Sequence, residues 1–231
     1  MDFKRGLKDG LPIGLGYFPV SFGFGLMVIS NNLDAFTAIA ISMTNLTSAG
    51  QVAGLAVIAA MGSYAEIAFT EFVINIRYAL MSLSLSQKLD KSFTLGHRFI
   101  AAFGITDEIF AVASAKPKEI NVKYMYGLMV LPIVGWNLGT ITGALAGNVL
   151  PEALKAALGM AIYGMFIAIV VPAAKRHKGI LFTAIVAVAV SLIMRYAPVL
   201  KTVSPGFAII ISAVIAAALA AWLFPVKEEE Q

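Results

Sequence analysis

Long apolar stretches separated by short polar or basic connections fill nearly the whole chain. Most are at least as long as the ~20 residues a helix needs to cross a bilayer, and none alternates apolar and polar positions as a membrane strand does. The pattern predicts an all-α polytopic membrane protein with about seven or eight transmembrane or re-entrant helices. The stretches are residues 11–29, 35–62, 64–86, 93–114, 124–147, 153–173, 180–196 and 206–224.

Composition supports this class and narrows the function. Of 231 residues, 59% are hydrophobic and 13% are charged, whereas soluble domains carry about 25% charged residues. No long polar stretch remains for a soluble domain, so we expect one membrane-embedded domain over residues 1–231. The N-terminus has no evident cleavage site, and we expect an uncleaved first span in a multi-pass protein of the cell membrane.

Several function classes are disfavoured. The chain has no cysteine, which excludes disulfides and thiolate metal sites. His97 and His177 lie in basic connections, and no HExxH motif or phosphate-binding loop occurs. We therefore expect no enzyme activity, cofactor or metal. The net charge of +4 comes from connections and ends, which is typical of topology signals rather than of a nucleic-acid partner.

The basic connections leave two topologies open. Clusters at residues 4–8, 116–123 and 175–178 are expected to face the cytoplasm, which agrees with eight crossings and both termini inside. That count places the basic connection 87–98 outside. If this connection is cytoplasmic instead, 93–114 is interfacial and 35–62 is a re-entrant hairpin broken at Ser48-Ala49-Gly50.

Two apolar stretches combine proline with many glycines. The first, GLPIGLGYFPVSFGFG, contains Pro12 and Pro19, and the fifth contains Pro132. Such paired spans can mark a midplane transporter site, and we expect the first to be interrupted, with Gly23 and Gly25 near a substrate. For the fifth, interruption and close helix packing both remain open. They open two possible halves, 1–115 and 120–231, whose similarity is otherwise too weak to define a repeat.

The stretch 64–86 carries polar groups at membrane depth, where an ionisable side chain costs at least about 2.5–3.5 kcal/mol. At about 100° per residue these groups fall on two helix faces. We expect the first face to contact substrate or protons and the second to brace the helix through a Glu66–Arg77 ion pair, although Arg77 could equally be a ligand. The first face carries Glu71, Asn75, Tyr78 and Ser82, and the second carries Glu66, Thr70, Arg77 and Ser84.

Three further polar groups lie among apolar residues. Asp107 and Glu108 follow Thr106, and they either bind substrate or protons or simply begin a helix capped by Thr106. Gln51 lies beside the small residues at 48–50, where a broken helix would offer N–H groups to a carboxylate. Asn137, beside Trp136, is a comparable group in the fifth stretch, though a lone amide is often an interhelical hydrogen bond.

Four motifs together resemble the AzlC-type branched-chain amino-acid permease family. They are the opening GLPIGLGYFPVSFGFG, then SAGQ, FVINIRYALMSLSL and TDEIFAV, in the family's order over about the first 115 residues. The resemblance implies the large subunit of a two-component exporter of branched-chain amino acids. Its implied partner is a small hydrophobic AzlD-type membrane subunit, and its implied mode is secondary transport.

The polar residues and the resemblance meet in one hypothesis. A zwitterionic aliphatic amino acid needs a donor for its carboxylate, an acceptor for its ammonium group and an apolar pocket. Desolvation favours protonation of buried carboxylates, so a carboxylate in a span could couple export to the proton-motive force. The rival interpretation is an assembly subunit without its own substrate site. The candidate substrate ligands are Gln51, Glu71, Asn75, Asp107, Asn137, Gly23 and Gly25, and the candidates for proton coupling are Glu71, Asp107 and Glu108.

Overall fold

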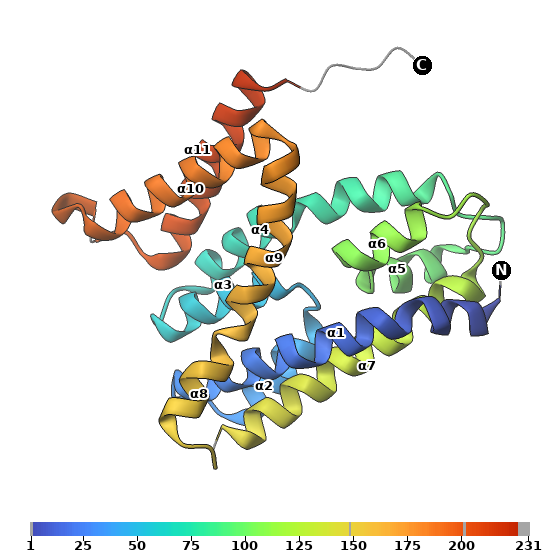
Figure 1. Cartoon of the computed structure of the whole chain (residues 1–231), viewed down its shortest axis with the longest axis horizontal. Helices are drawn as coiled ribbons and strands as arrows, with labels where there is room; N and C mark the ends of the chain where they lie inside the picture. Colours follow the sequence, from blue (N-terminus) through green and yellow to red (C-terminus); the bar gives the residue numbers. More distant parts are fainter. Residues whose placement is uncertain (1, 148, 201, 226–231) are drawn as a thin grey trace. The chain divides into compact units, whose positions relative to one another are not determined.

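The structure, a computed structural model, describes residues 2–147, 149–200 and 202–225 (Figure 1). Within these ranges the chain is helical, with no β-strand and one isolated backbone bridge, which confirms the expected all-α class. The elements are α1 (Phe3–Ser30), α2 (Ala35–Thr44), α3 (Ser48–Ala59), α4 (Tyr64–Ser86), α5 (Leu95–Phe103), α6 (Asp107–Ser114), α7 (Val122–Ala146), α8 (Glu152–Gly159), α9 (Ala161–Arg176), α10 (Lys178–Tyr196), the 3₁₀ turn η1 (Pro198–Leu200) and α11 (Pro205–Leu223).

The helices fall into two compact units. The first comprises Met1–Gln51 and Asn75–Ile162, and the second comprises Val52–Ile74 and Tyr163–Gln231. Helices α3 and α4 contribute residues to both units. The first unit contains the packed pair α1 and α7 and the C-terminal half of α4, and the second contains the packed pair α10 and α11.

Four helices in the described part of the chain are long and apolar enough to cross a membrane, namely α1, α7, α10 and α11. Helix α4 has 23 residues, which at about 1.5 Å per residue is also long enough for a ~30 Å hydrocarbon core. Its charged side chains lower its apolar character. The total of seven or eight transmembrane or re-entrant helices therefore stays a prediction.

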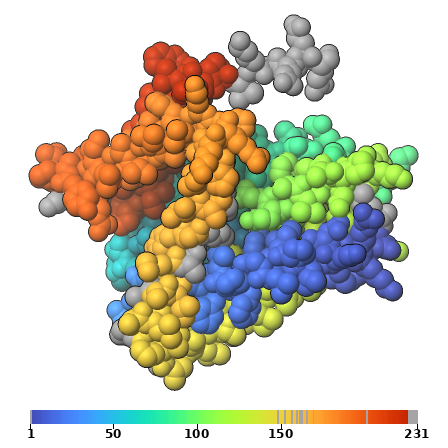
Figure 2. Space-filling view, viewed as in Figure 1, coloured from blue at the N-terminus to red at the C-terminus, as the bar shows by residue number. Residues whose placement is uncertain are grey.

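Glycines bring α1 and α7 into close contact. An added Cβ at Gly14 of α1 would lie 2.6 Å from the Leu131 carbonyl oxygen of α7, and one at Gly135 would meet the Gly14 backbone. Small residues allow membrane helices to approach this closely. Figure 2 shows the dark blue atoms of α1 as a continuous band, with the green atoms of the 95–114 segment beside it.

The same glycines do not interrupt the helices. Helix α1 is continuous through Pro12 and Pro19, and α7 is continuous through Pro132. The prediction of a broken first span is therefore wrong, and of the two possibilities for the fifth span the structure shows close packing. A missing side chain permits both a bend in a helix and a close approach of two helices. Here the glycines allow the close approach of α1 and α7.

The basic connections 87–94 and 115–121 lie side by side. The Ile120 N–H donates to the Lys88 carbonyl at 2.8 Å, and the Asp90 N–H donates to the Ile120 carbonyl at 2.9 Å. The Lys88 ammonium also donates to the carbonyls of Ser114 and Lys116 at the end of α6. Residues hydrogen-bonded in this way lie on the same side of a membrane, so residues 93–114 leave that side and return to it.

The lengths of α5 and α6 favour the topology in which residues 93–114 do not cross the membrane. Helices α5 and α6 have nine and eight residues, and at about 1.5 Å per residue each reaches less than half of a ~30 Å core. They form a short helical hairpin instead of a spanning helix. The two basic connections therefore lie on the same side, as in the second of the two topologies left open by the sequence, and the number of crossings stays a prediction.

The hairpin and its loops are tied to the packed pair. The Asp9 carboxylate of α1 accepts from the Lys116 ammonium at 2.6 Å and from the Tyr124 hydroxyl of α7 at 2.8 Å. His97 of α5 lies 2.7 Å from the Tyr126 hydroxyl of α7. These contacts fix both ends of the hairpin in the first unit, and they place His97 in a helix rather than in a solvated loop.

Candidate functional site

Residues 45–47 break the apolar stretch between α2 and α3. At the end of α2 the Asn45 N–H donates to the Ile41 carbonyl at 2.8 Å. At the start of α3 the Thr47 hydroxyl oxygen accepts the Gly50 N–H at 3.3 Å, as an N-terminal cap does. The predicted position of the break, Ser48-Ala49-Gly50, is therefore wrong by about one helical turn, because these three residues form the first turn of α3 and the break directly precedes them.

Gln51 links the two sides of this break. Its side chain is buried, its amide nitrogen donates to the Asn45 carbonyl, and its amide oxygen accepts from the Ser42 hydroxyl at 3.4 Å. The Ser42 hydroxyl in turn lies 2.7 Å from the Thr140 hydroxyl of α7. Both polar ends of Gln51 are thus used within the protein. This arrangement suits positioning of the break rather than the direct substrate contact expected from the sequence.

A second break, residues 104–106, separates α5 from α6. Thr106 begins α6, and its hydroxyl oxygen accepts the Ile109 N–H at 3.4 Å. Asp107 and Glu108 follow in the first turn, where the helix dipole favours acidic side chains. The helix-cap interpretation is therefore correct for Thr106. It does not account for the two carboxylates, because both reach other helices.

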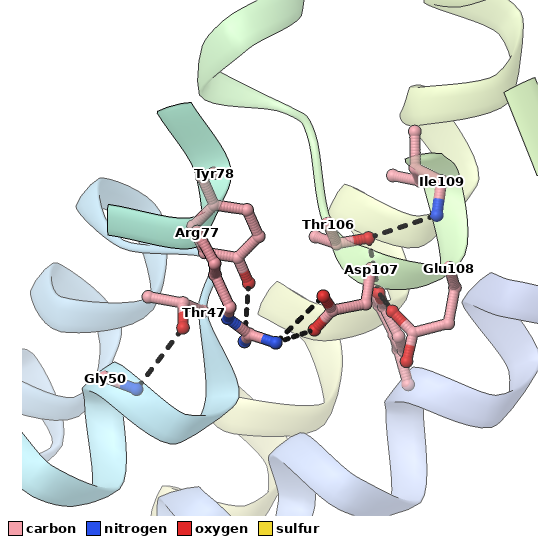
Figure 3. Close-up of polar contacts among 9 residues, drawn as sticks. Thr47, Gly50, Arg77, Tyr78, Thr106, Asp107, Glu108 and Ile109 are labelled. Carbon is pink, nitrogen blue, oxygen red and sulfur yellow. Dashed lines mark hydrogen bonds and ion pairs between the residues drawn. The ribbon is translucent and has the colours of Figure 1, made fainter. Parts of the chain in front are cut away.

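Asp107 and Glu108 point in different directions from α6 (Figure 3). Asp107 pairs with Arg77 of α4, whose Nη1 lies 2.6 Å from one carboxylate oxygen and 2.8 Å from the other. Arg77 also donates to the Tyr78 hydroxyl at 3.3 Å, with its guanidinium carbon 4.9 Å from the centre of the Tyr78 ring. This pair ties the start of α6 to α4.

Glu108 ties α6 to α1. Its carboxylate is hydrogen-bonded to the Tyr17 hydroxyl, which also lies 2.6 Å from the Thr106 hydroxyl oxygen. Tyr17 is buried and packs edge-on against Trp136 of α7, with ring centres 5.3 Å apart. The first turn of α6 is thus held between two helices by two separate carboxylates.

A cavity of about 190 Å³ lies where the two breaks approach α4. Its walls come from the α2–α3 break, from one face of α4, and from the end of α5 with the following turn. They combine hydroxyl and amide groups with apolar side chains. The lining residues are Thr44, Asn45, Leu46, Thr47, Asn75, Tyr78, Ala102, Phe103 and Ile105.

The remaining candidate ligands lie elsewhere. Glu71 belongs to the second unit, where its carboxylate would lie 2.8 Å from a Cβ added at Gly54. The Asn137 amide donates to the Ile133 carbonyl of its own helix at 2.9 Å. Gly23 is buried in α1, and an added Cβ at Gly25 would lie 2.6 Å from the Ala144 backbone nitrogen of α7. The two glycines therefore serve packing and do not border a break.

Glu66 contacts the start of α11 and not Arg77 of its own helix, which is the partner expected from the sequence. Its buried carboxylate accepts from the Ser204 hydroxyl at 2.5 Å and from the Gly206 N–H at 2.9 Å, at the start of α11. The predicted Glu66–Arg77 ion pair is wrong, because Arg77 pairs with Asp107. Eleven positions on one helix separate the two residues by about 16 Å, which is too far for an ion pair.

The Glu66 contacts give a stability prediction. Glu66→Ala leaves the buried Gly206 N–H without an acceptor, at about 1–3 kcal/mol, and also removes the acceptor of the partly exposed Ser204 hydroxyl. Glu66→Gln keeps one acceptor oxygen. We expect the melting temperature in detergent to fall most for alanine and less for glutamine. Glu119→Ala, at an exposed loop position, is the control. Equal melting temperatures for all three variants would contradict this role.

Comparison with known proteins places the chain in a family. The model of the AzlC protein family matches residues 12–150, which is more than half of the chain and includes both helix breaks. The chain belongs to the AzlC family. This confirms the resemblance carried by the four sequence motifs.

Relatives of this AzlC-family chain are membrane proteins. It is 30% identical over 189 residues to the inner membrane protein YgaZ of Escherichia coli K12, covering 79% of this chain and 77% of YgaZ. It is 32% identical over 178 residues to a membrane protein of Archaeoglobus fulgidus, covering 76% and 78% of the two chains. A membrane protein of Helicobacter pylori J99 is 26% identical over 155 residues, covering 64% of this chain and 67% of that protein. No solved structure matches the chain.

The site also contains residues that sequence reasoning did not select. Asn45 and Thr47 line the cavity, and Tyr17 holds Glu108. The run Thr44-Asn45-Leu46-Thr47-Ser48 carried a usable signal, because four polar residues in five interrupt an apolar stretch and suit helix ends. Tyr17 carried none, since a tyrosine among glycines is typical of many membrane helices. Among the described residues, no group of three or more His, Cys, Asp or Glu side chains could hold a metal ion.

Proposed function

We propose that this chain is the substrate-binding subunit of a transporter that exports branched-chain amino acids across the cell membrane, driven by the proton-motive force. The observation that carries the proposal is the cavity between the two helix breaks and α4. Membership in the AzlC family supports a role related to membrane transport, and the cavity supplies the chemistry for a small zwitterion.

The cavity offers both kinds of contact that an aliphatic amino acid needs. The Asn75 amide, the Tyr78 hydroxyl and the Thr47 hydroxyl can donate to a carboxylate or accept from an ammonium group. Leu46, Phe103 and Ile105 provide an apolar wall for the side chain. Its volume of about 190 Å³ is below the ~300–1,000 Å³ typical for drug-sized ligands, so it suits a small molecule.

A small hydrophobic AzlD-type subunit is the proposed partner, and transport leaves the substrate chemically unchanged. The test uses the purified chain in liposomes, with and without the partner, and measures counterflow of labelled leucine or valine. Asn75→Leu removes a polar group from the cavity and is expected to slow counterflow by about tenfold or more. Ser84→Ala, on an exposed face of α4, is the matched control.

The outcomes separate transport from the rival assembly role. The proposal is supported if the chain, alone or with the partner, shows counterflow, and if this counterflow is lost in Asn75→Leu and kept in Ser84→Ala. Counterflow that is equal in both variants would place the substrate outside this cavity. No counterflow with the partner present would leave the chain as an assembly subunit.

The coupling carboxylate can be identified by neutral substitutions. Counterflow exchanges substrate without net proton movement, whereas export driven by a pH gradient requires the coupling group to bind and release a proton. Of the three candidates, we expect Glu108→Gln to lose gradient-driven export and retain counterflow, because Glu108 is held by the neutral Tyr17 hydroxyl and not by a cation. Asp107→Asn is expected to impair both activities, because it breaks the pair with Arg77.

Glu71→Gln is the third member of this series. Glu71 is not among the residues that line the cavity, so we expect Glu71→Gln to retain more gradient-driven export than Glu108→Gln does. If Glu71→Gln instead loses more gradient-driven export than Glu108→Gln, and both variants keep counterflow, proton coupling would be assigned to Glu71. The sequence alone also allowed this assignment.

A further inference from the structure

A second cavity of about 210 Å³ lies beside the first, between the end of α4 and α5. Its α4 wall contains Ser82, Leu85 and Ser86, and its α5 wall contains Arg98 and Ala102. Apart from Arg98 and the two serines, these side chains are apolar. This second cavity is therefore mostly apolar. It lies in the same unit as the first cavity between the two helix breaks and α4, which we call the polar cavity.

The two cavities share part of their lining. Ala102 and Ile105 border both the polar cavity and the second cavity. One face of α4 also continues from one to the other, with Asn75 and Tyr78 on the polar cavity and Ser82 on the second. Ala102, which is exposed, and Ile105, which is buried, thus lie on the border that the two spaces share.

The second cavity reaches the basic loops. Its lining includes Leu89, which forms the backbone bridge to Ile120 between the two basic connections. Lysines and arginines of short connections mark the cytoplasmic side of a membrane. The second cavity therefore extends from that side toward the polar cavity.

We propose that the second cavity is the cytoplasmic entry chamber of the transport path, and that Ala102 and Ile105 form the gate between this chamber and the polar cavity. This inference rests on the proposed function for the nature of its occupant. The occupant is an aliphatic amino acid on its way to the polar cavity, whose side chain fits the apolar walls and whose carboxylate is attracted by Arg98.

The local structure allows such a gate to move. Helix α5 has nine residues, and it ends at Phe103, directly before the break that contains Gly104 and Ile105. Ala102 directly precedes that end and has a small side chain, so a small shift of α5 away from α4 joins the two spaces. The Arg77–Asp107 and Tyr17–Glu108 contacts hold the start of α6. The His97–Tyr126 contact holds the start of α5, so the shift is confined to the end of α5.

The chain provides a direct test, because it has no natural cysteine. Single Ser82→Cys and Ser86→Cys variants place a thiol in the entry chamber, and Ser84→Cys places one on the exposed opposite face of α4. The full-length chain, with its partner where required, is placed in membrane vesicles of both orientations. A charged, membrane-impermeant maleimide is then added from one side.

A thiol reacts as its thiolate, which forms in water and is suppressed in lipid. We expect the Ser82→Cys and Ser86→Cys thiols to react from the cytoplasmic side at least about tenfold faster than the Ser84→Cys thiol. Equal rates at all three positions, no reaction at Ser82→Cys, or faster reaction from the opposite side would each overturn the entry chamber. A lipid or a partner helix filling this space would leave the Ser82→Cys thiol unreactive.

The gate is tested separately with an enlarged side chain. The thiol of Asn75→Cys lies in the polar cavity and is expected to react from the cytoplasmic side, and adding Ala102→Phe is expected to slow this reaction by about tenfold. The same Ala102→Phe change is expected to leave the Ser86→Cys reaction unchanged. If Ala102→Phe slows neither or both reactions, the gate is not at Ala102.

These labelling results do not depend on which substrate is carried. If the labelling pattern is as expected but leucine and valine are not transported, the proposed function fails while the entry chamber stands. If transport occurs but the labelling pattern is absent, the entry chamber fails while the proposed function stands.

Discussion

Reversing the charge of Arg77 is expected to reduce transport to near background, and reversing Asp107 as well is expected to restore part of it. The single variant Arg77→Asp places two carboxylates where an ion pair of 2.6 Å now joins α4 to α6. The Arg77 and Asp107 side chains are 42% and 38% exposed, so loss of the pair itself costs only about 0–1 kcal/mol. The expected loss of transport comes instead from the repulsion between two carboxylates beside the proposed substrate cavity. The same loss is expected for Asp107→Arg alone.

The double variant restores the attraction between the two helices. It does not restore everything, because an arginine in the first turn of α6 faces the positive end of the helix dipole. We expect counterflow of labelled leucine to be more than about threefold higher in the double variant than in either single variant, a coupling that only interacting residues show. Losses that simply add in the double variant would show that the pair does not support the site.

The neighbouring Tyr17–Glu108 contact distinguishes the two carboxylates. A charge exchange is not available there, because tyrosine carries no positive charge. Asp107 therefore forms an ion pair with Arg77, whereas Glu108 is hydrogen-bonded to the uncharged Tyr17 hydroxyl. The assignment of separate roles to adjacent acidic residues follows from the 100° turn between them on a helix.

Helix periodicity predicted the part of the site that lies on one helix. Asn75, Tyr78 and Ser82 were expected to share a face of α4, and in the structure they line two adjoining cavities. The partner of Arg77 was not predictable in the same way. Glu66, Asp107 and Glu108 were all available carboxylates, and only the folded chain shows which of them α6 brings to α4.

The fold was likewise predictable only where it depends on local sequence patterns. Apolar stretches gave the helical class because burial in lipid requires satisfied backbone groups. The return of residues 93–114 to the basic side depends on the bridge between Leu89 and Ile120, a contact between distant backbone groups that leaves no pattern in the sequence. The glycines in the first stretch were misread because a break and a close helix contact are both favoured by a missing side chain, and α1 stays continuous through its two prolines.

Two alanine substitutions on α1, two positions apart, are expected to have opposite effects on stability. At Gly14 an added Cβ lies 2.6 Å from the Leu131 carbonyl oxygen and 2.8 Å from its carbon, both backbone atoms of α7 that cannot rotate away. At Gly16 nothing lies within 4 Å. Gly14→Ala therefore forces the helices apart, and we expect a loss of about 1–3 kcal/mol, as for overpacked cores.

Gly16→Ala meets no atom and replaces a poor helix former by the best, which favours the helix by up to about 1 kcal/mol. Thermal unfolding in detergent, followed by the loss of the monodisperse peak on size-exclusion chromatography, measures both variants. A lower midpoint for Gly14→Ala with an unchanged or higher midpoint for Gly16→Ala is the expected result. Equal midpoints would mean that close backbone contact between α1 and α7 does not stabilise the unit that positions both helix breaks. Because α7 also carries Thr140 and Trp136, the helix separation at Gly14 should disturb the Gln51 and Tyr17 contacts, so that transport falls in Gly14→Ala and persists in Gly16→Ala.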